Sequence, residues 1–413
     1  MKMKKTLWTK DFSLITVTTV LSAIAGEALV LPVSLLVFDE TQSTLLSSII
    51  MICSFLPDLL FGVLVSPAID RGSKKHWVIA LDIASAAMMV AMGLLMLKIS
   101  FSYWIYVIFT FVFSTASAFY QVSFGAWFPN LIPVGFEQKG YAVSSTIYPV
   151  ITLSMAPLSA FLYTKVPISW MFLVAAALLV LSIVLESMIG NSCKSQGGIQ
   201  SLKEYIKELK SGFAYFKKEK GMRNISGYMG ITNGISVGES LMQQAYFQTS
   251  AVLNATMFGF LTTAEMIGRV IGGVMQYFIK VPAKKRFAFT KTVYICYDSF
   301  EAFLLYLPYP VMLGIRFILG SLGVQSATIR QAAVQSYIPP EMRGRINAIL
   351  SGICSLGMII VQVAAGMLGE VMPYRTAALL LGGVNFLAVV ALIIIPAKVN
   401  RPVYEAERAS GEV

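Results

Sequence analysis

The sequence predicts an all-α membrane protein whose twelve transmembrane helices form two pseudo-symmetric six-helix bundles. Three observations predict this fold: a strongly apolar composition, twelve uncharged runs long enough to cross a bilayer, and a correspondence between the two halves of the chain. Of the 413 residues, 56% are apolar and 13% are charged, against about 25% charged residues in a typical soluble protein. This balance excludes disordered chains, fibrous proteins, disulfide-stabilised domains and ordinary soluble enzymes.

Twelve apolar runs are long enough to span a membrane, since a helix needs about 20 mainly apolar residues to cross the hydrocarbon core. Each run is bounded by charges, Gly or Pro, which are typical of helix ends. The first run is too long for the core of a signal peptide, so we expect it to be retained. The runs cover about residues 12–38, 44–67, 76–97, 101–128, 140–164, 167–189, 224–248, 252–279, 287–307, 310–336, 345–369 and 374–396.

The positive charges alternate between the connections. Most of the 32 Lys and Arg residues lie in every second connection, whereas the other connections hold only Lys98, Lys165 and Arg375. Because positive connections stay on the cytoplasmic side, we expect a multi-pass protein of the inner (cytoplasmic) membrane with both termini in the cytoplasm. The same distribution accounts for the net charge of +11, so we expect no nucleic-acid partner.

The longest polar segment divides the predicted spans into six and six. We therefore expect an N-terminal bundle over residues 1–189, a cytoplasmic linker over 190–223, and a C-terminal bundle with a short tail over 224–413. Within the linker, apolar residues recur at helical spacing opposite lysines, which predicts an amphipathic helix. This helix lies on the anionic inner leaflet or is a solvated connection between the bundles; the pattern fits both.

The two halves of the chain correspond at one constant offset. A shift of 206 residues superimposes Gly62 on Gly268, Pro133 on Pro339, and Lys139 on Arg345. An offset that persists across several connections indicates an internal duplication. Parallel repeats of this kind place a substrate cavity near the membrane midplane, where the two halves meet.

The connection between the second and third spans carries a distinctive charge pattern. It reads PDLLFGVLVSPAIDRGSKKHW, and its charged residues are Asp58, Asp70, Arg71, Lys74 and Lys75. The pattern resembles the signature loop of the major facilitator superfamily, and the number of spans and the duplication extend this resemblance over the whole chain. Ser66 stands where that loop usually has a glycine.

The resemblance implies that this loop belongs to a gating network. In such a family, Asp70 docks on the N-terminus of a facing helix, where the helix dipole favours a carboxylate, and latches one conformation of the cytoplasmic gate. Ordinary positive-inside charge would explain the lysines but not an aspartate among them. We expect Asp58 and Asp82 to join the network through Arg71 or Arg330.

Two further patterns bear on the branch of the family. The segment that ends at Asp82, together with FPNLIP and IPPEMRGRINA, is similar to the macrolide-efflux and enterobactin-exporter branch, although Ser85 stands where that branch often has an arginine. Pro157 keeps the proline of the antiporter signature in the fifth span, without its glycines. The arginine expected in the fourth span is missing, and its repeat mate is Arg316, so the usual route of proton coupling is in doubt.

Ionisable residues inside spans are costly and often functional. Glu27 lies near the middle of the first span, and Glu239 lies on a polar stripe of the seventh. The membrane interior penalises the ionised form of each carboxyl, which suits reversible protonation or binding of a cationic group; a hydrogen-bonded structural role is the alternative. The predicted substrate- and proton-binding residues are Glu27, Glu239, Ser236, Gln243 and Asn233.

Other charges in the spans predict structural ion pairs. Glu265 and Arg269 are four residues apart, so they share one helix face. Glu301 and Arg316 flank Pro308 at similar separations, so an antiparallel helical hairpin would place them at similar depth. We expect both pairs to stabilise the C-terminal bundle.

These features predict a secondary active transporter rather than an enzyme. No Gly-Lys dipeptide is present, so the chain lacks a Walker A phosphate site, and we expect no cofactor or metal. The leading hypothesis is export of an amphipathic small molecule, drug-like or siderophore-like, in exchange for protons, by a monomer in the lipid bilayer. The alternatives are an importer or facilitator on the same fold, and a membrane sensor or lipid-handling protein without solute flux.

Overall fold

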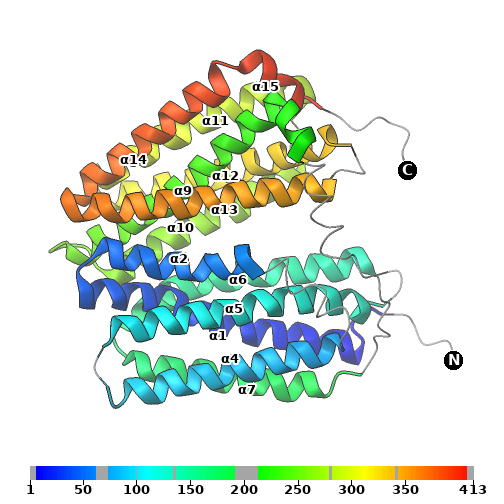
Figure 1. The fold of residues 1–413 in the computed structure, drawn as a ribbon, viewed down its shortest axis with the longest axis vertical. Coiled ribbons are helices and arrows are strands. Elements are labelled where there is room, and N and C mark those ends of the chain that lie inside the picture. The colour runs from blue at the N-terminus through cyan, green and yellow to red at the C-terminus, as the bar shows by residue number, and fades with distance from the viewer. Residues whose placement is uncertain are drawn as a thin grey trace. The chain divides into compact units, whose positions relative to one another are not determined.

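The computed structural model describes residues 6–61, 73–99, 101–133, 136–190, 213–278, 281–339 and 343–406. These residues form an all-helical protein, and each predicted span corresponds to one long helix (Figure 1). The long helices are α1 (Lys10–Thr41), α2 (Thr44–Phe61), α4 (Lys74–Met96), α5 (Tyr103–Trp127), α6 (Glu137–Tyr163), α7 (Ile168–Ser187), α9 (Lys220–Thr249), α10 (Ala255–Phe278), α11 (Ala283–Phe303), α12 (Tyr309–Tyr337), α13 (Arg343–Val371) and α14 (Tyr374–Ala388). The predicted fold class, twelve transmembrane helices in an all-α membrane protein, is confirmed.

The contacts between helices divide the chain into two compact units. The N-terminal unit contains α1, most of α2, and α4 to α7, and the C-terminal unit contains α9 to α14 and the short helix α15 (Ala397–Tyr404). Residues 191–212, which include much of the predicted linker helix, lie outside the described residues.

The two units differ in how apolar their helices are. Among the described residues, nine helices are long and apolar enough to cross a membrane by length and composition, and α9, α10 and α11 are the long helices outside that set. Helices α9 and α11 carry charged or amide side chains that are buried inside the C-terminal unit, and Glu265 of α10 pairs with the buried Arg316. Their low hydropathy therefore reflects polar residues that pack against other helices rather than against lipid.

Glycines bring α10 and α12 into direct backbone contact. A Cβ atom built at Gly268 would overlap the backbone carbonyl of Phe317, and one built at Gly320 would overlap the carbonyl of Glu265. Small residues permit such close approach of membrane helices. This contact brings Glu265 of α10 beside Arg316, the residue of α12 that precedes Phe317.

The last long helix changes its hydrogen-bond pattern before it ends. Helix α14 continues as a π-helix over Val389–Ile394. The side-chain amide of Asn400 in α15 donates to the carbonyls of Leu392, at 2.7 Å, and Ile393, at 3.3 Å. Asn400 thereby satisfies carbonyl groups that a helix end leaves without intrahelical donors.

In the N-terminal unit, α4 and α1 both pack against α7. The ammonium group of Lys75, in the first turn of α4, donates to the carbonyls of Ser187, at 2.9 Å, and Ile189, at 2.6 Å. A cation at the C-terminus of a helix is favoured by the helix dipole. Lys75, predicted as a gating residue, thus joins the ends of two helices in its own unit.

Candidate functional site

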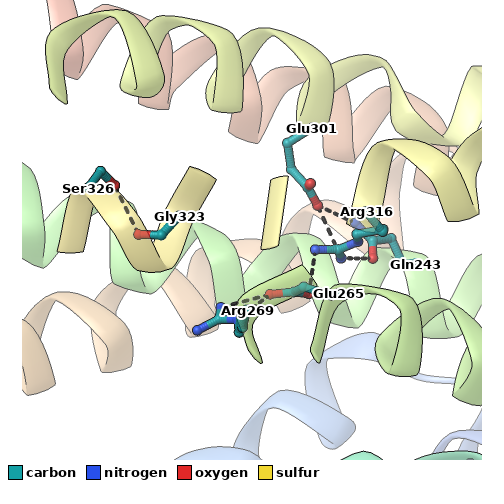
Figure 2. A network of polar contacts seen from close by, with 7 residues as sticks. All are labelled: Gln243, Glu265, Arg269, Glu301, Arg316, Gly323 and Ser326. Carbon is teal, nitrogen blue, oxygen red and sulfur yellow. Dashed lines mark hydrogen bonds and ion pairs between the residues drawn. The ribbon is translucent and has the colours of Figure 1, made fainter. Parts of the chain in front are cut away.

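A polar network surrounds Arg316 in the interior of the C-terminal unit (Figure 2). Its guanidinium contacts Glu265 of α10 at 2.8 Å and Glu301 of α11 at 3.1 Å. Gln243 of α9 donates to Glu301 at 2.7 Å and accepts a hydrogen bond from Arg316. Glu265 also pairs with Arg269 at 2.7 Å. We call these five residues the Arg316 network.

Formal charges balance within the Arg316 network, because two glutamates face two arginines. Arg316 is only 8% exposed, and a buried charge is tolerated when it is paired and hydrogen-bonded. The predicted pairs of Glu265 with Arg269 and of Glu301 with Arg316 are both present, and Glu265 additionally joins them. The geometry is that of a structural brace across α9, α10, α11 and α12.

Two more carboxyl groups lie near this network, and neither forms an ion pair with a described residue. Glu239 of α9 is 3% exposed, and its Oε1 atom receives no hydrogen bond within the described part of the chain. Asp298 of α11 accepts from the amide of Asn385 at 2.8 Å, and Asn385 also donates to Thr232 at 3.1 Å. The interior of the unit therefore contains more carboxyl groups than cations.

The polar stripe predicted on α9 splits between two environments. Glu239 and Gln243 are buried within the C-terminal unit, whereas Ser236 is exposed. Asn233 is half-buried and forms a hydrogen bond with Cys354 of α13. Side chains three residues apart on a helix point about 60° apart, and those four residues apart point about 40° apart. The two edges of a wide polar stripe therefore face different neighbouring helices. Within the described C-terminal unit, Glu239 and Gln243 therefore lie in the interior and Ser236 at the surface.

Glu27 occupies a different position, in the N-terminal unit. It is half-buried on α1, and its carboxyl group is hydrogen-bonded to Thr152 of α6. Tyr148 of α6 lies within electrostatic range of it and is hydrogen-bonded to Gln121 of α5. Glu27 is therefore held by one hydroxyl group where α1 meets α6, and it is neither sealed in the core nor fully exposed.

The structure gives Asp82 a partner that the sequence did not indicate. Asp82 of α4 is 5% exposed, and its carboxyl group lies beside that of Glu186 in α7, which is 0% exposed. One of its two expected partners, Arg330 of α12, donates to the hydroxyl of Tyr294 at 2.9 Å in the C-terminal unit. Asp82 thus lies in a buried carboxyl pair, and its other predicted partner, Arg71, lies outside the described residues.

Sequence analysis missed Glu186. One signal was present, because this residue lies inside the predicted span 167–189, where an ionisable side chain calls for a role. Its position near the end of that span made it resemble an ordinary charge at the membrane surface. The remaining gating residues lie elsewhere: Lys74 is half-buried at the start of α4, Asp58 lies in α2, and Asp70 and Arg71 lie outside the described residues.

The carboxyl groups of this interior can bind protons or cationic groups. Among the described residues, no three His, Cys, Asp or Glu side chains come together as a metal site. The unpaired carboxyl groups are instead single or in pairs: Glu27, Asp82 with Glu186, Glu239, and Asp298. A carboxyl in this setting is costly when ionised and alone, so its charge state is sensitive to water, protons and cationic ligands.

Solved structures with a similar fold are membrane transporters. A variant of the nucleoside transporter NupG superposes with a TM-score of 0.71 at 12% identity, covering 93% of this chain and 99% of that one. A variant of the peptide transporter POT gives 0.68 at 10% identity and covers 96% of both chains. A bacterial homolog of the human lysosomal transporter Spinster, in an inward-facing and unoccupied conformation, gives 0.66 at 12% identity, covering 97% of this chain and 99% of that one.

Sequence comparisons agree with this fold. Macrolide efflux protein A of Streptococcus pyogenes is 23% identical over 387 residues, which cover 88% of this chain and 90% of that protein. The protein of the same name from Enterococcus faecalis is 24% identical over 328 residues, which cover 74% of this chain and 95% of that protein. The family model of the Major Facilitator Superfamily matches residues 15–297 and 285–412. This match extends over most of the chain, and the protein therefore belongs to the Major Facilitator Superfamily of membrane transporters.

Proposed function

We propose that this transporter exports amphipathic small molecules in exchange for protons by alternating access. The observation that carries the proposal is the carboxyl group of Glu27, which is half-buried on α1 with the hydroxyl of Thr152 as its hydrogen-bond partner. Transport proteins use such intramembrane carboxyl groups as proton carriers or as counter-ions for cationic substrates. A site that binds either a proton or a cation, but not both, would couple the two fluxes in opposite directions.

The names of the relatives support a substrate class. Both relatives are called macrolide efflux proteins, and many macrolides combine a large apolar ring with an amine that is positively charged at neutral pH. An amphipathic cation of this kind fits a carboxyl group set among apolar helices. We therefore propose macrolide-like cations as substrates, an inner-membrane location with both termini in the cytoplasm, and a monomer as the working unit.

Expression in a bacterial host without its own drug pumps tests the proposal. We expect the wild-type protein to raise the macrolide concentration needed to stop growth, because the drug is expelled from the cytoplasm. Glu27→Gln keeps the size of the side chain and its capacity to bond to Thr152, but it cannot carry a proton or a negative charge. This variant should lose the resistance and appear in the membrane at wild-type levels.

The matched control is Glu405→Gln at the end of α15. Glu405 is partly exposed and faces Arg401 at 3.6 Å, and ion pairs at surfaces contribute little to stability. We expect this variant to keep full resistance. Equal resistance in Glu27→Gln and wild type would contradict the assigned role of Glu27, and increased drug accumulation in cells that express the wild type would indicate import instead.

A further inference from the structure

The N-terminal unit contains a second acidic element, Asp82 with Glu186, which we call the acid pair. Asp82 projects from α4 and Glu186 from the last turn of α7, and the two helices pack against each other. Neither side chain is exposed by more than 5%. The residues are 104 positions apart in the sequence, so helix packing alone brings the two carboxyl groups together.

The hydroxyl groups of Thr18 and Ser182 lie beside the Glu186 carboxyl, but neither has the geometry of a donated hydrogen bond to it. Both oxygens of Glu186, and Oδ2 of Asp82, are buried without a donor among the described residues. Ser182, one turn before Glu186, donates to the carbonyl of Thr18 at 3.4 Å, and Thr18 donates to the carbonyl of Ile15 at 3.1 Å. Ser182 also contacts the hydroxyl of Ser22 at 3.1 Å, so these neighbours of the acid pair are neutral hydroxyl and carbonyl groups.

Titratable groups on the surrounding helices offer no positive charge to the acid pair. Tyr120 of α5 is within electrostatic range of both carboxyls, and Tyr148 of α6 is within range of Asp82; both are neutral phenols. On α4, the ammonium of Lys75 is committed to the carbonyls at the end of α7. No described residue forms an ion pair with either acid.

Two carboxylates cannot hydrogen-bond to each other, because each offers only acceptors. Asp82 and Glu186 are buried side by side with no cation beside them among the described residues, and like charges in such a pair disfavour full ionisation, so the pair favours one shared proton. We propose that the acid pair is a proton-binding site, which holds one shared proton in this conformation and releases it when water reaches the pair. On release, the O–H bond breaks, its electron pair stays on the carboxylate, and the proton passes to water.

This inference rests on the proposed proton-coupled export, and it adds a proton site distinct from Glu27. Tyr148 lies within electrostatic range of both Glu27 and Asp82, and Tyr120 lies within range of Tyr148 and of the acid pair. Polar side chains thus connect the surroundings of Glu27 with the acid pair through the interior of one unit.

Infrared spectroscopy of the purified, full-length protein tests the site without substrate. The stretching band of a protonated carboxyl group reports the shared proton directly. We expect wild type at neutral pH to show a band that Asp82→Asn and Glu186→Gln each remove, because the introduced amide donates to the remaining carboxylate in place of the proton. Both variants replace the shared proton with an amide donor, so they should fold and elute as wild type does. Glu405→Gln is the control and should leave the spectrum unchanged.

Transport measurements in liposomes show whether a negative result rejects the proton site or the proposed proton-coupled export. We expect both amide variants to exchange erythromycin across the membrane but to lose accumulation driven by a pH gradient. An unchanged infrared spectrum in both variants would overturn the proton site. Loss of the wild-type band on adding sodium ions at constant pH would also overturn it, in favour of a sodium site. A wild-type protein that shows the band but has no gradient-driven flux would reject proton-coupled export while supporting the proton site.

Discussion

Replacing Arg316 with methionine is expected to lower the free energy of unfolding by about 3–5 kcal/mol, the range measured when one partner of a buried ion pair is removed. Arg316 faces Glu265 at 2.8 Å and Glu301 at 3.1 Å in the interior of the C-terminal unit. Methionine fills much of the same volume, so the expected loss comes from leaving carboxylates without their cation. Thermal denaturation of the detergent-purified variant measures it.

A second substitution distinguishes the loss of charge pairing from the loss of packing as the cause of the lower stability. Glu301→Gln in the Arg316→Met background removes the carboxylate that is left without a cation, whereas Glu265 keeps Arg269 at 2.7 Å. The double variant should therefore be more stable than Arg316→Met alone. If both variants denature at the same temperature, the Arg316 network does not stabilise the unit by charge pairing. Glu301→Gln alone should also destabilise the protein, since it removes one of two carboxylates beside a buried guanidinium.

Adding one methyl group at Gly268 is expected to destabilise the C-terminal unit by about 1–3 kcal/mol or more, as overpacking does. The new Cβ would overlap the backbone carbonyl of Phe317, and a backbone carbonyl cannot move aside unless α12 itself shifts. Because Arg316 directly precedes Phe317, the shift would also disturb the Arg316 network. Thermal denaturation and the level of folded protein in the membrane measure the effect.

Gly273 provides the matched control for this prediction. It lies on the same helix, and a Cβ atom there would meet nothing within 4 Å. Gly273→Ala should be neutral or stabilising, because alanine is the better helix former by about 1 kcal/mol. Equal stability of Gly268→Ala and Gly273→Ala would mean that α10 and α12 do not approach as closely as described.

The helices could be predicted from the sequence because bilayer thickness sets their length. The run predicted at 310–336, for example, became α12 (Tyr309–Tyr337), and that at 167–189 became α7 (Ile168–Ser187). The pair of Glu301 and Arg316 was also predictable, since a short hairpin around Pro308 fixes the relative depth of its two arms. In these cases, the spacing of residues along the chain and a chain reversal at a known proline were sufficient to predict the structure.

Contacts between distant helices could not be predicted in the same way. Asp82 and Glu186 meet because of how α4 and α7 are rotated and registered, which hydropathy does not determine. The approach of Glu265 to Arg316 depends on glycine contacts between α10 and α12, and the sequence does not indicate which helix packs against a given glycine. On α9, the polar stripe was visible in sequence, but its division between buried Glu239 and exposed Ser236 depends on which neighbours cover each edge.

Flux through the purified protein in liposomes tests the central claim most directly. With a pH gradient as the sole energy source and no ATP, we expect labelled erythromycin to accumulate on the side with the higher proton concentration, each movement accompanied by proton flow in the opposite direction. Collapse of the gradient with a protonophore should stop the accumulation, and Glu27→Gln should abolish it. Accumulation on the side with the lower proton concentration, or flux that is independent of the gradient, would contradict proton-coupled export.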